Sequence, residues 1–142
     1  MRASASGATM ARRGKTELLS PMPSATKPAL TIEPRFRLRL GRSLEFGPGK
    51  AELLERIART RSIGEAAREM GMSYMTAWSH VRSLNRAPGG PFVTATRGGA
   101  QRGGATLTLV GAELLRFYRE LEQESLSATR HAQDGLTRLL RR

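Results

Sequence analysis

Cysteine is absent from the chain of 142 residues, and aspartate occurs once, at Asp134. Without thiols the chain has no disulfide bonds, no thiolate metal sites and no cysteine nucleophile. It also has no run of about 18 apolar residues, which excludes an apolar transmembrane helix, and its N-terminus lacks the apolar segment of a secretory signal. These absences favour a cytoplasmic protein without a membrane anchor.

Catalytic and metal-binding patterns are scarce as well. The two histidines, His80 and His131, are far apart in sequence, and neither has an acidic cluster near it, so no metal site is expected. Paired carboxylates for acid–base catalysis would have to be glutamates, and these fall on the solvated faces of predicted helices. The sequence therefore predicts neither an enzyme nor a cofactor.

Positive charge dominates the composition. The chain has 24 Lys and Arg against 12 Asp and Glu, a formal net charge of +12, and a pI near 11.6. A balance of this kind favours an acidic polymer as partner, with nucleic acid as the first candidate. Basic tails could produce the same pI without a partner. However, residues from 34 onward retain 19 basic and 10 acidic side chains, so the excess does not depend on the N-terminus.

Two parts of the chain differ in composition. Residues 1–33 are rich in Ser, Ala, Thr, Pro and Arg and show little apolar periodicity, which predicts a disordered basic leader. Residues 34–142 then form the predicted domain. It begins with "RFRLRL" at 35–40, whose alternation predicts a strand with Phe36, Leu38 and Leu40 on its buried face. A helix is expected over about 48–60, with Pro48 near its start.

The segment from Ser62 to Arg86 has the pattern of a helix-turn-helix. Ser62 and Glu65 match a capping box, Gly71 suits the end of the first helix, and Ser73 can cap the second. Two helices joined by so short a turn, the first lined with alanines, are typical of this motif.

The second helix divides into two faces at about 100° per residue. The core side is predicted to hold Tyr74, Ala77, Trp78, Val81, Leu84 and Asn85. The opposite side has no acidic residue and consists largely of hydroxyls and arginines, which reach base edges and phosphates. A merely solvated face is the alternative. The residues predicted to face the major groove are Ser73, Tyr74, Thr76, Ser79, Arg82, Ser83 and Arg86.

A glycine-rich loop, "RGGAQRGG", joins "FVTAT" to "ATLTL", and this pattern predicts a β-hairpin. The loop has no lysine of a P-loop and no βαβ unit for a dinucleotide fingerprint, so a wing on DNA is favoured over an enzyme loop. No Asp or Glu occurs from Met70 to Ala112, which suits phosphate contacts. The predicted wing contacts are Arg97, Gly98, Gly99, Arg102, Gly103 and Gly104.

A last amphipathic helix is predicted over about 108–131. Thr108 caps it, Gly135 interrupts the pattern, and a basic tail follows. Its apolar positions are Val110, Leu114, Leu115, Tyr118 and Leu121. The full order of elements is strand, three helices, hairpin wing and C-terminal helix, which predicts an α+β winged helix-turn-helix fold.

The motif "SIGEAAREMGMSY", followed by "AW" at Ala77, "LN" at Leu84 and the glycine-rich wing, resembles the N-terminal DNA-binding domain of ModE-type, molybdate-responsive regulators. The helix-turn-helix alone is shared with LysR-type regulators. The resemblance implies a homodimer, paired through strand 35–40 and the last helix, on double-stranded DNA. In that family molybdate is sensed by C-terminal domains. The chain ends at Arg142, so this chain alone is not expected to bind molybdate.

Two other functions stay open from the sequence. Winged helices also serve as protein-interaction modules, and the amphipathic last helix would suit one. An oxyanion-binding protein or enzyme is the other alternative.

Overall fold

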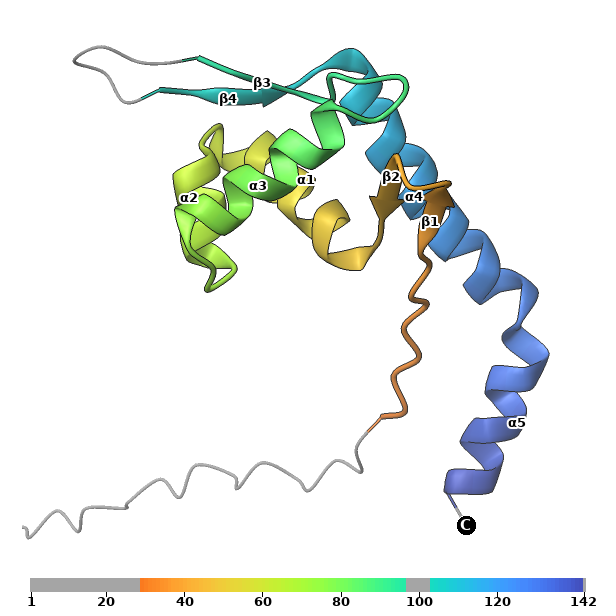
Figure 1. Cartoon of the computed structure of the whole chain (residues 1–142). Coiled ribbons are helices and arrows are strands. Elements are labelled where there is room, and N and C mark those ends of the chain that lie inside the picture. The colour runs from red at the N-terminus through yellow and green to blue at the C-terminus, as the bar shows by residue number, and fades with distance from the viewer. Residues whose placement is uncertain (1–28, 97–102, 142) are drawn as a thin grey trace, which may run out of the picture. The chain divides into compact units, whose positions relative to one another are not determined.

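Four short strands and five helices make up the part of the chain that the computed structural model describes, residues 29–96 and 103–141 (Figure 1). Internal contacts divide the chain into Met1–Leu30 and Thr31–Arg142, and the second unit contains all nine of these described elements. Residues 1–28 of the predicted leader lie outside the described residues, so its disorder stays a prediction.

The first two strands, β1 (Leu38–Leu40) and β2 (Leu44–Phe46), form an antiparallel hairpin with Leu38 opposite Phe46. The predicted single strand over 35–40 was therefore wrong in two respects: β1 is shorter, and β2 was missed because three residues are too few to show alternation. Leu40 is 55% exposed rather than buried. It ends β1 beside the turn, where no other part of the described chain covers it.

Helix α1 (Pro48–Thr60) confirms the predicted range. Proline occupies its first turn, and Ala51, Leu53, Leu54 and Ile57 are buried at helical spacing. The helix ends at Arg61, whose φ of 56° is left-handed and whose N–H donates to the Ile57 carbonyl.

Helices α2 (Ile63–Glu69) and α3 (Tyr74–Asn85) confirm the predicted helix-turn-helix, and α1, α2 and α3 pack in succession (Figure 1). Gly71 joins them at a φ of +66°, where a side chain would be strained. Only half of the capping box forms: the Ser62 hydroxyl accepts from the Glu65 N–H, but the Glu65 carboxylate pairs with Arg68.

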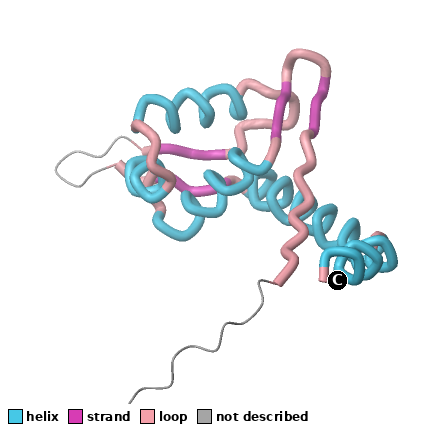
Figure 2. Tube along the Cα trace, turned by 90° about the horizontal axis from the view of Figure 1, so that it is seen from below, coloured by secondary structure: helices cyan, strands magenta, loops and turns pink. Residues whose placement is uncertain are grey.

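The wing is a second two-stranded sheet, separate from the first, made of β3 (Val93–Ala95) and β4 (Ala105–Leu107) (Figure 2). Its register sets Val93 opposite Leu107. The wing is attached to the first helix because the Ala105 N–H donates to the Arg61 carbonyl over 2.9 Å.

The last predicted helix is two helices, α4 (Leu109–Ala128) and α5 (Arg130–Leu140), and the predicted interruption at Gly135 was wrong. Thr108 caps α4 through the Gly111 N–H, as expected. The break falls at Thr129, whose hydroxyl bonds back to the Ser125 carbonyl, and such local bonds compete with regular helix. One glycine within a helix costs only about 1 kcal/mol, which α5 tolerates at Gly135.

The core lies where the hairpin, the three-helix unit and α4 meet. Tyr118 of α4 is 1% exposed, packs edge-on against Phe46 with ring centroids 5.1 Å apart, and donates its hydroxyl to the Phe36 carbonyl over 2.9 Å. At Gly111, a Cβ would lie 2.0 Å from the Phe92 carbonyl oxygen, so only glycine permits α4 to approach the wing base this closely. Among the described residues, none of the helices has both the length and the apolarity to cross a membrane.

Candidate nucleic-acid interface

Helix α3 exposes the side that was predicted from the sequence to face the major groove. Thr76, Ser79, Arg82, Ser83 and Arg86 are all exposed. Ala77, Val81 and Leu84 are buried on the opposite side, so most of the predicted division between core and surface is confirmed. Tyr74 is the exception for the core: it is 54% exposed, because the first residue of α3 projects beyond the packed part of the helix. It remains among the predicted contact residues.

The start of α3 is fixed by two hydroxyls. The Ser73 Oγ accepts from the Thr76 N–H over 3.1 Å and lies 2.8 Å from the Thr76 Oγ1. Capping of this kind satisfies an N–H that would otherwise lack a partner in the first turn. Both hydroxyls therefore take part in setting the direction in which α3 leaves the turn.

A cleft separates the beginning of the helix-turn-helix from the wing. It is lined by Gly64 and Tyr74 on one side and by Thr96, Gly103 and Gly104 on the other. Thr96 holds the wing together there, because its Oγ1 donates to the Gly104 carbonyl and accepts from the Gly104 N–H, both over 3.1 Å. Of the predicted wing contacts, Arg97, Gly98, Gly99 and Arg102 lie outside the described residues.

Asn85 joins the end of α3 to the base of the wing. Its Oδ1 accepts from the N–H groups of Phe92 and Val93 over 2.9 and 3.0 Å, and its Nδ2 donates to the Val93 carbonyl over 2.8 Å. One amide side chain thus fixes the orientation of β3 relative to α3. Sequence analysis placed Asn85 on the core side but did not identify this role.

The turn of the β1–β2 hairpin also reaches the α3 surface. A depression there is lined by Arg42 and Ser43 from the turn and by Ser79, Arg82, Ser83 and Arg86 from α3. Sequence analysis missed Arg42 and Ser43 because β2 was missed, and the signal that would have found them is Gly41 between two short apolar runs.

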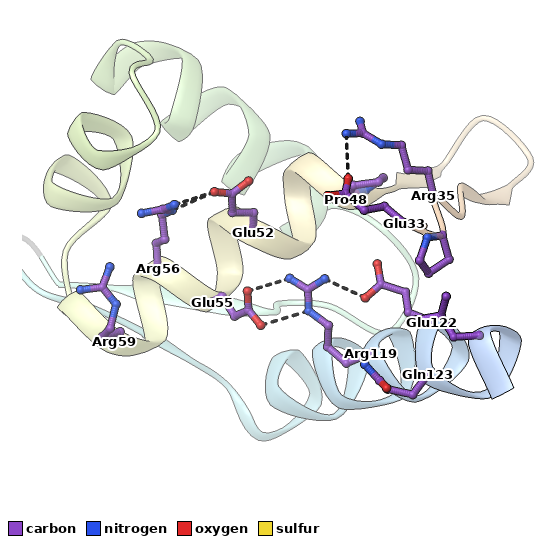
Figure 3. Close-up of a pocket in the computed structure, with 12 residues that line it drawn as sticks. Glu33, Arg35, Pro48, Glu52, Glu55, Arg56, Arg59, Arg119, Glu122 and Gln123 are labelled. Atoms are coloured by element: carbon purple, nitrogen blue, oxygen red, sulfur yellow. Dashed lines mark hydrogen bonds and ion pairs between the residues drawn. The ribbon is translucent and has the colours of Figure 1, made fainter. Parts of the chain in front are cut away.

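Arginines on the other side of the domain are paired with glutamates. Arg119 of α4 lies between Glu55 and Glu122, with N–O distances of 2.6 and 2.8 Å (Figure 3). The pair with Glu55 links α4 to α1, whereas Glu122 belongs to α4 itself. Both glutamates raise the pKa of Arg119 above its ordinary value. Arg59 and Arg56 likewise lower the pKa of Glu69. These carboxylates bind guanidinium groups and are not arranged for acid–base chemistry.

Helix α4 has an apolar stripe that is exposed except at Leu114, which is half-buried against the core. Val110, Leu114, Phe117 and Leu121 recur at intervals of four, three and four residues, which places them on one side of the helix. Phe117 is 57% exposed, and Val110 and Leu121 are also exposed. Leu40 at the end of β1 is a further exposed apolar residue.

Comparison with known families decides what kind of domain this geometry represents. Residues 49–112, from α1 to the start of α4, match the model of the bacterial regulatory helix-turn-helix proteins of the lysR family. Residues 49–112 form a helix-turn-helix of the lysR type. The matched range includes all of the residues predicted to contact DNA from α3 and both strands of the wing.

Individual relatives sharpen this assignment. The chain is 45% identical over 77 residues to the molybdenum-pterin-binding protein MopB of Rhodobacter capsulatus. It is 32% identical over 97 residues to the transcriptional regulator ModE of Haemophilus influenzae, and 35% identical over 86 residues to the DNA-binding transcriptional dual regulator ModE of Escherichia coli K12. The resemblance to ModE-type regulators is thus confirmed.

These matches cover only part of each relative. They span 54%, 68% and 61% of this chain, and 28%, 38% and 33% of MopB and the two ModE proteins respectively. The chain therefore corresponds to about a third of each of these proteins.

Proposed function

We propose that the chain is a DNA-binding transcriptional regulator of the ModE type, acting on double-stranded DNA in the bacterial cytoplasm. The observation that carries the proposal is the exposed side of α3, which has arginines and hydroxyls but no carboxylate and belongs to a lysR-type helix-turn-helix. Groups of this chemistry contact base edges and phosphates in a major groove.

Each part of the proposed interface has a defined task. Ser79, Arg82, Ser83 and Arg86 face the groove along α3, while Ser73, Tyr74 and Thr76 contact DNA at its N-terminal end. The wing, with Gly103 and Gly104 at the foot of its tip, lies along the backbone, and Arg97 and Arg102 neutralise flanking phosphates. Glycines there permit close approach of the two backbones, because they have no Cβ.

We also propose that two copies pair through β1 and α4. Leu40 and the stripe of Val110, Phe117 and Leu121 are exposed in the single chain, and a symmetric partner would cover them. A two-fold dimer presents two α3 helices, which matches an inverted-repeat operator.

Equilibrium binding of the full chain to a labelled duplex, measured by fluorescence anisotropy at several salt concentrations, tests the proposal. The double variant Arg82→Gln with Arg86→Gln removes two phosphate or base contacts per protomer. We expect the slope of log K against log salt to fall by about 0.9 for each lost phosphate contact. Arg97→Ala with Arg102→Ala should lower the slope similarly and weaken binding to all sequences.

The control is Arg116→Gln with Arg138→Gln, which removes the same charge from α4 and α5. It should retain the wild-type slope, because neither residue belongs to the proposed interface. Wild-type chain that does not bind duplex at low salt would refute DNA binding and favour a protein-interaction module. A thermal shift with molybdate would favour an oxyanion-binding protein, and we expect none from this chain alone.

A further inference from the structure

The turn between β1 and β2 brings an arginine to α3 from outside the helix-turn-helix. Arg42 and Ser43 share one depression with Ser79, Arg82, Ser83 and Arg86. Three guanidinium groups and three hydroxyls therefore surround it, and every one of these side chains can donate hydrogen bonds. Its two sources are far apart in sequence, since residues 42 and 43 precede α1 and the others belong to α3.

Charge pairing distinguishes Arg42 from its neighbours in the same hairpin. Arg37 and Arg39 both lie near the Glu45 carboxylate, with N–O distances of 3.3 and 3.9 Å. Within the described residues, Arg42, Arg82 and Arg86 form no ion pair with a carboxylate. Guanidinium groups that lack a protein anion keep their donors available for a planar or tetrahedral anion from outside.

The position of Arg42 is also well defined. Gly41 has a φ of +54°, and the Ser43 N–H donates to the Leu40 carbonyl over 3.1 Å, which closes the turn. β2 packs against α3, and Phe46 at its end is fully buried. The backbone of the turn is thus attached to the same core as the helix, so an anion has to order only the Arg42 side chain and not the turn itself.

We propose that the β1–β2 turn is a DNA-backbone contact in which Arg42, with the Ser43 hydroxyl, binds a phosphate beside the groove that α3 enters. The inference rests on the proposed DNA binding and extends the interface beyond residues 49–112, the range of the family match. A backbone phosphate is the ligand because the depression opens onto the same side of α3 that faces DNA. The contact fixes the position of the helix and reads no base.

Arg42→Gln tests the contact in the full chain, with Arg138→Gln on α5 as its control. Both remove one positive charge, and within the described residues neither arginine forms an ion pair. For Arg42→Gln we expect the salt slope to fall by about 0.9 per bound protomer, and affinity near 0.1 M salt to fall roughly eightfold, the counterion-release value of one contact. Arg138→Gln should retain the wild-type slope. Arg42→Lys, which keeps the charge, should retain most of it.

The outcomes separate this inference from the proposed function. If wild-type chain binds duplex and Arg42→Gln keeps the wild-type slope, the turn contact is refuted while DNA binding stands. Equal losses from Arg42→Gln and Arg138→Gln would mean that only net charge matters, which also refutes the contact. Saturable competition by inorganic phosphate at constant ionic strength, lost in Arg42→Gln, would assign the depression to a free anion instead. Wild-type chain that does not bind DNA would overturn both proposals.

Discussion

Arginine has opposite roles on the two sides of this domain. Arg56 of α1 binds Glu52 of its own helix and Glu69 of α2. Arg119 of α4 binds Glu55 of α1 and Glu122 of its own helix, so both guanidinium groups are paired within the protein. On the α3 side, within the described residues, Arg42, Arg82 and Arg86 have no carboxylate partner. The comparison shows that net charge alone does not locate a binding surface. Arg61 and the α5 residues Arg130 and Arg138 also form no ion pair within the described residues. The α3 side differs because three unpaired arginines line one depression there.

The difference originates in helix spacing. Glu52 and Arg56 on α1, and Arg116 and Glu120 on α4, are four residues apart and pair within one helix. Helix α3 has arginines but no acidic residue at any position, so no such pair is available to it. Its positive charge is therefore not neutralised within the helix.

The largest effect is expected at Asn85, whose uncharged side chain joins α3 to the wing and so holds the α3 side of the domain in place. Asn85→Ala should lower the free energy of unfolding by about 3 kcal/mol, because it leaves the N–H groups of Phe92 and Val93 and the Val93 carbonyl without partners. Urea unfolding at fixed protein concentration measures this loss. Asn85→Asp keeps both accepted bonds but sets a carboxylate oxygen against the Val93 carbonyl, so it should be more destabilising at neutral pH than in acid, where the protonated carboxyl can donate to Val93. A loss for Asn85→Asp that is the same at both pH values would contradict the assigned geometry.

A substitution on α3 can also create an Arg–Glu pair of the kind that occurs on α4. In Ser79→Glu the new carboxylate lies three residues before Arg82 and can pair with it, so we expect stability to change by no more than about 0.5 kcal/mol. Affinity for duplex should fall about tenfold or more, because one guanidinium is neutralised and a negative charge faces the phosphates. Ser79→Gln, of the same size as the glutamate variant and without charge, is the control. It loses the Ser79 hydroxyl but adds no negative charge, so it should lose clearly less affinity than Ser79→Glu. Unimpaired binding by Ser79→Glu would show that this side of α3 does not approach DNA.

Much of this comparison could be predicted from the sequence. Periodicity and caps located α1, α2 and α3, and the 100° rotation per residue separated Val81 from Arg82 correctly. These signals are local, since each depends on residues within one or two turns. The absence of Asp and Glu between 70 and 112 was visible for the same reason.

The errors arose where structure depends on distant contacts. β2 has three residues, and its pairing with β1 and packing on α3 decide its conformation, so its sequence gave no periodic signal. Arg42 was overlooked as a consequence. Tyr74 fell within the core sector by angle, yet no packed neighbour covers the start of α3 enough to bury it. The break at Thr129 rather than Gly135 depends on side-chain bonds to helix carbonyls.

The smallest effects are expected for the α4 arginines that pair with glutamates. They test whether a paired arginine contributes to stability but not to DNA binding. Arg119→Gln removes one guanidinium from Glu55 and Glu122, and the Glu122 side chain is only 13% exposed. We expect a loss of about 1 kcal/mol in unfolding free energy, reduced by the solvent that reaches the pair. Arg116→Gln, whose pair with Glu120 lies on the exposed surface of the same helix, should change stability by about 0.5 kcal/mol or less. Both variants lose the same charge as Arg42→Gln, yet both should retain the wild-type salt slope for DNA. A slope lowered by Arg119→Gln would mean that paired arginines also serve binding, and the contrast between the two sides would not hold.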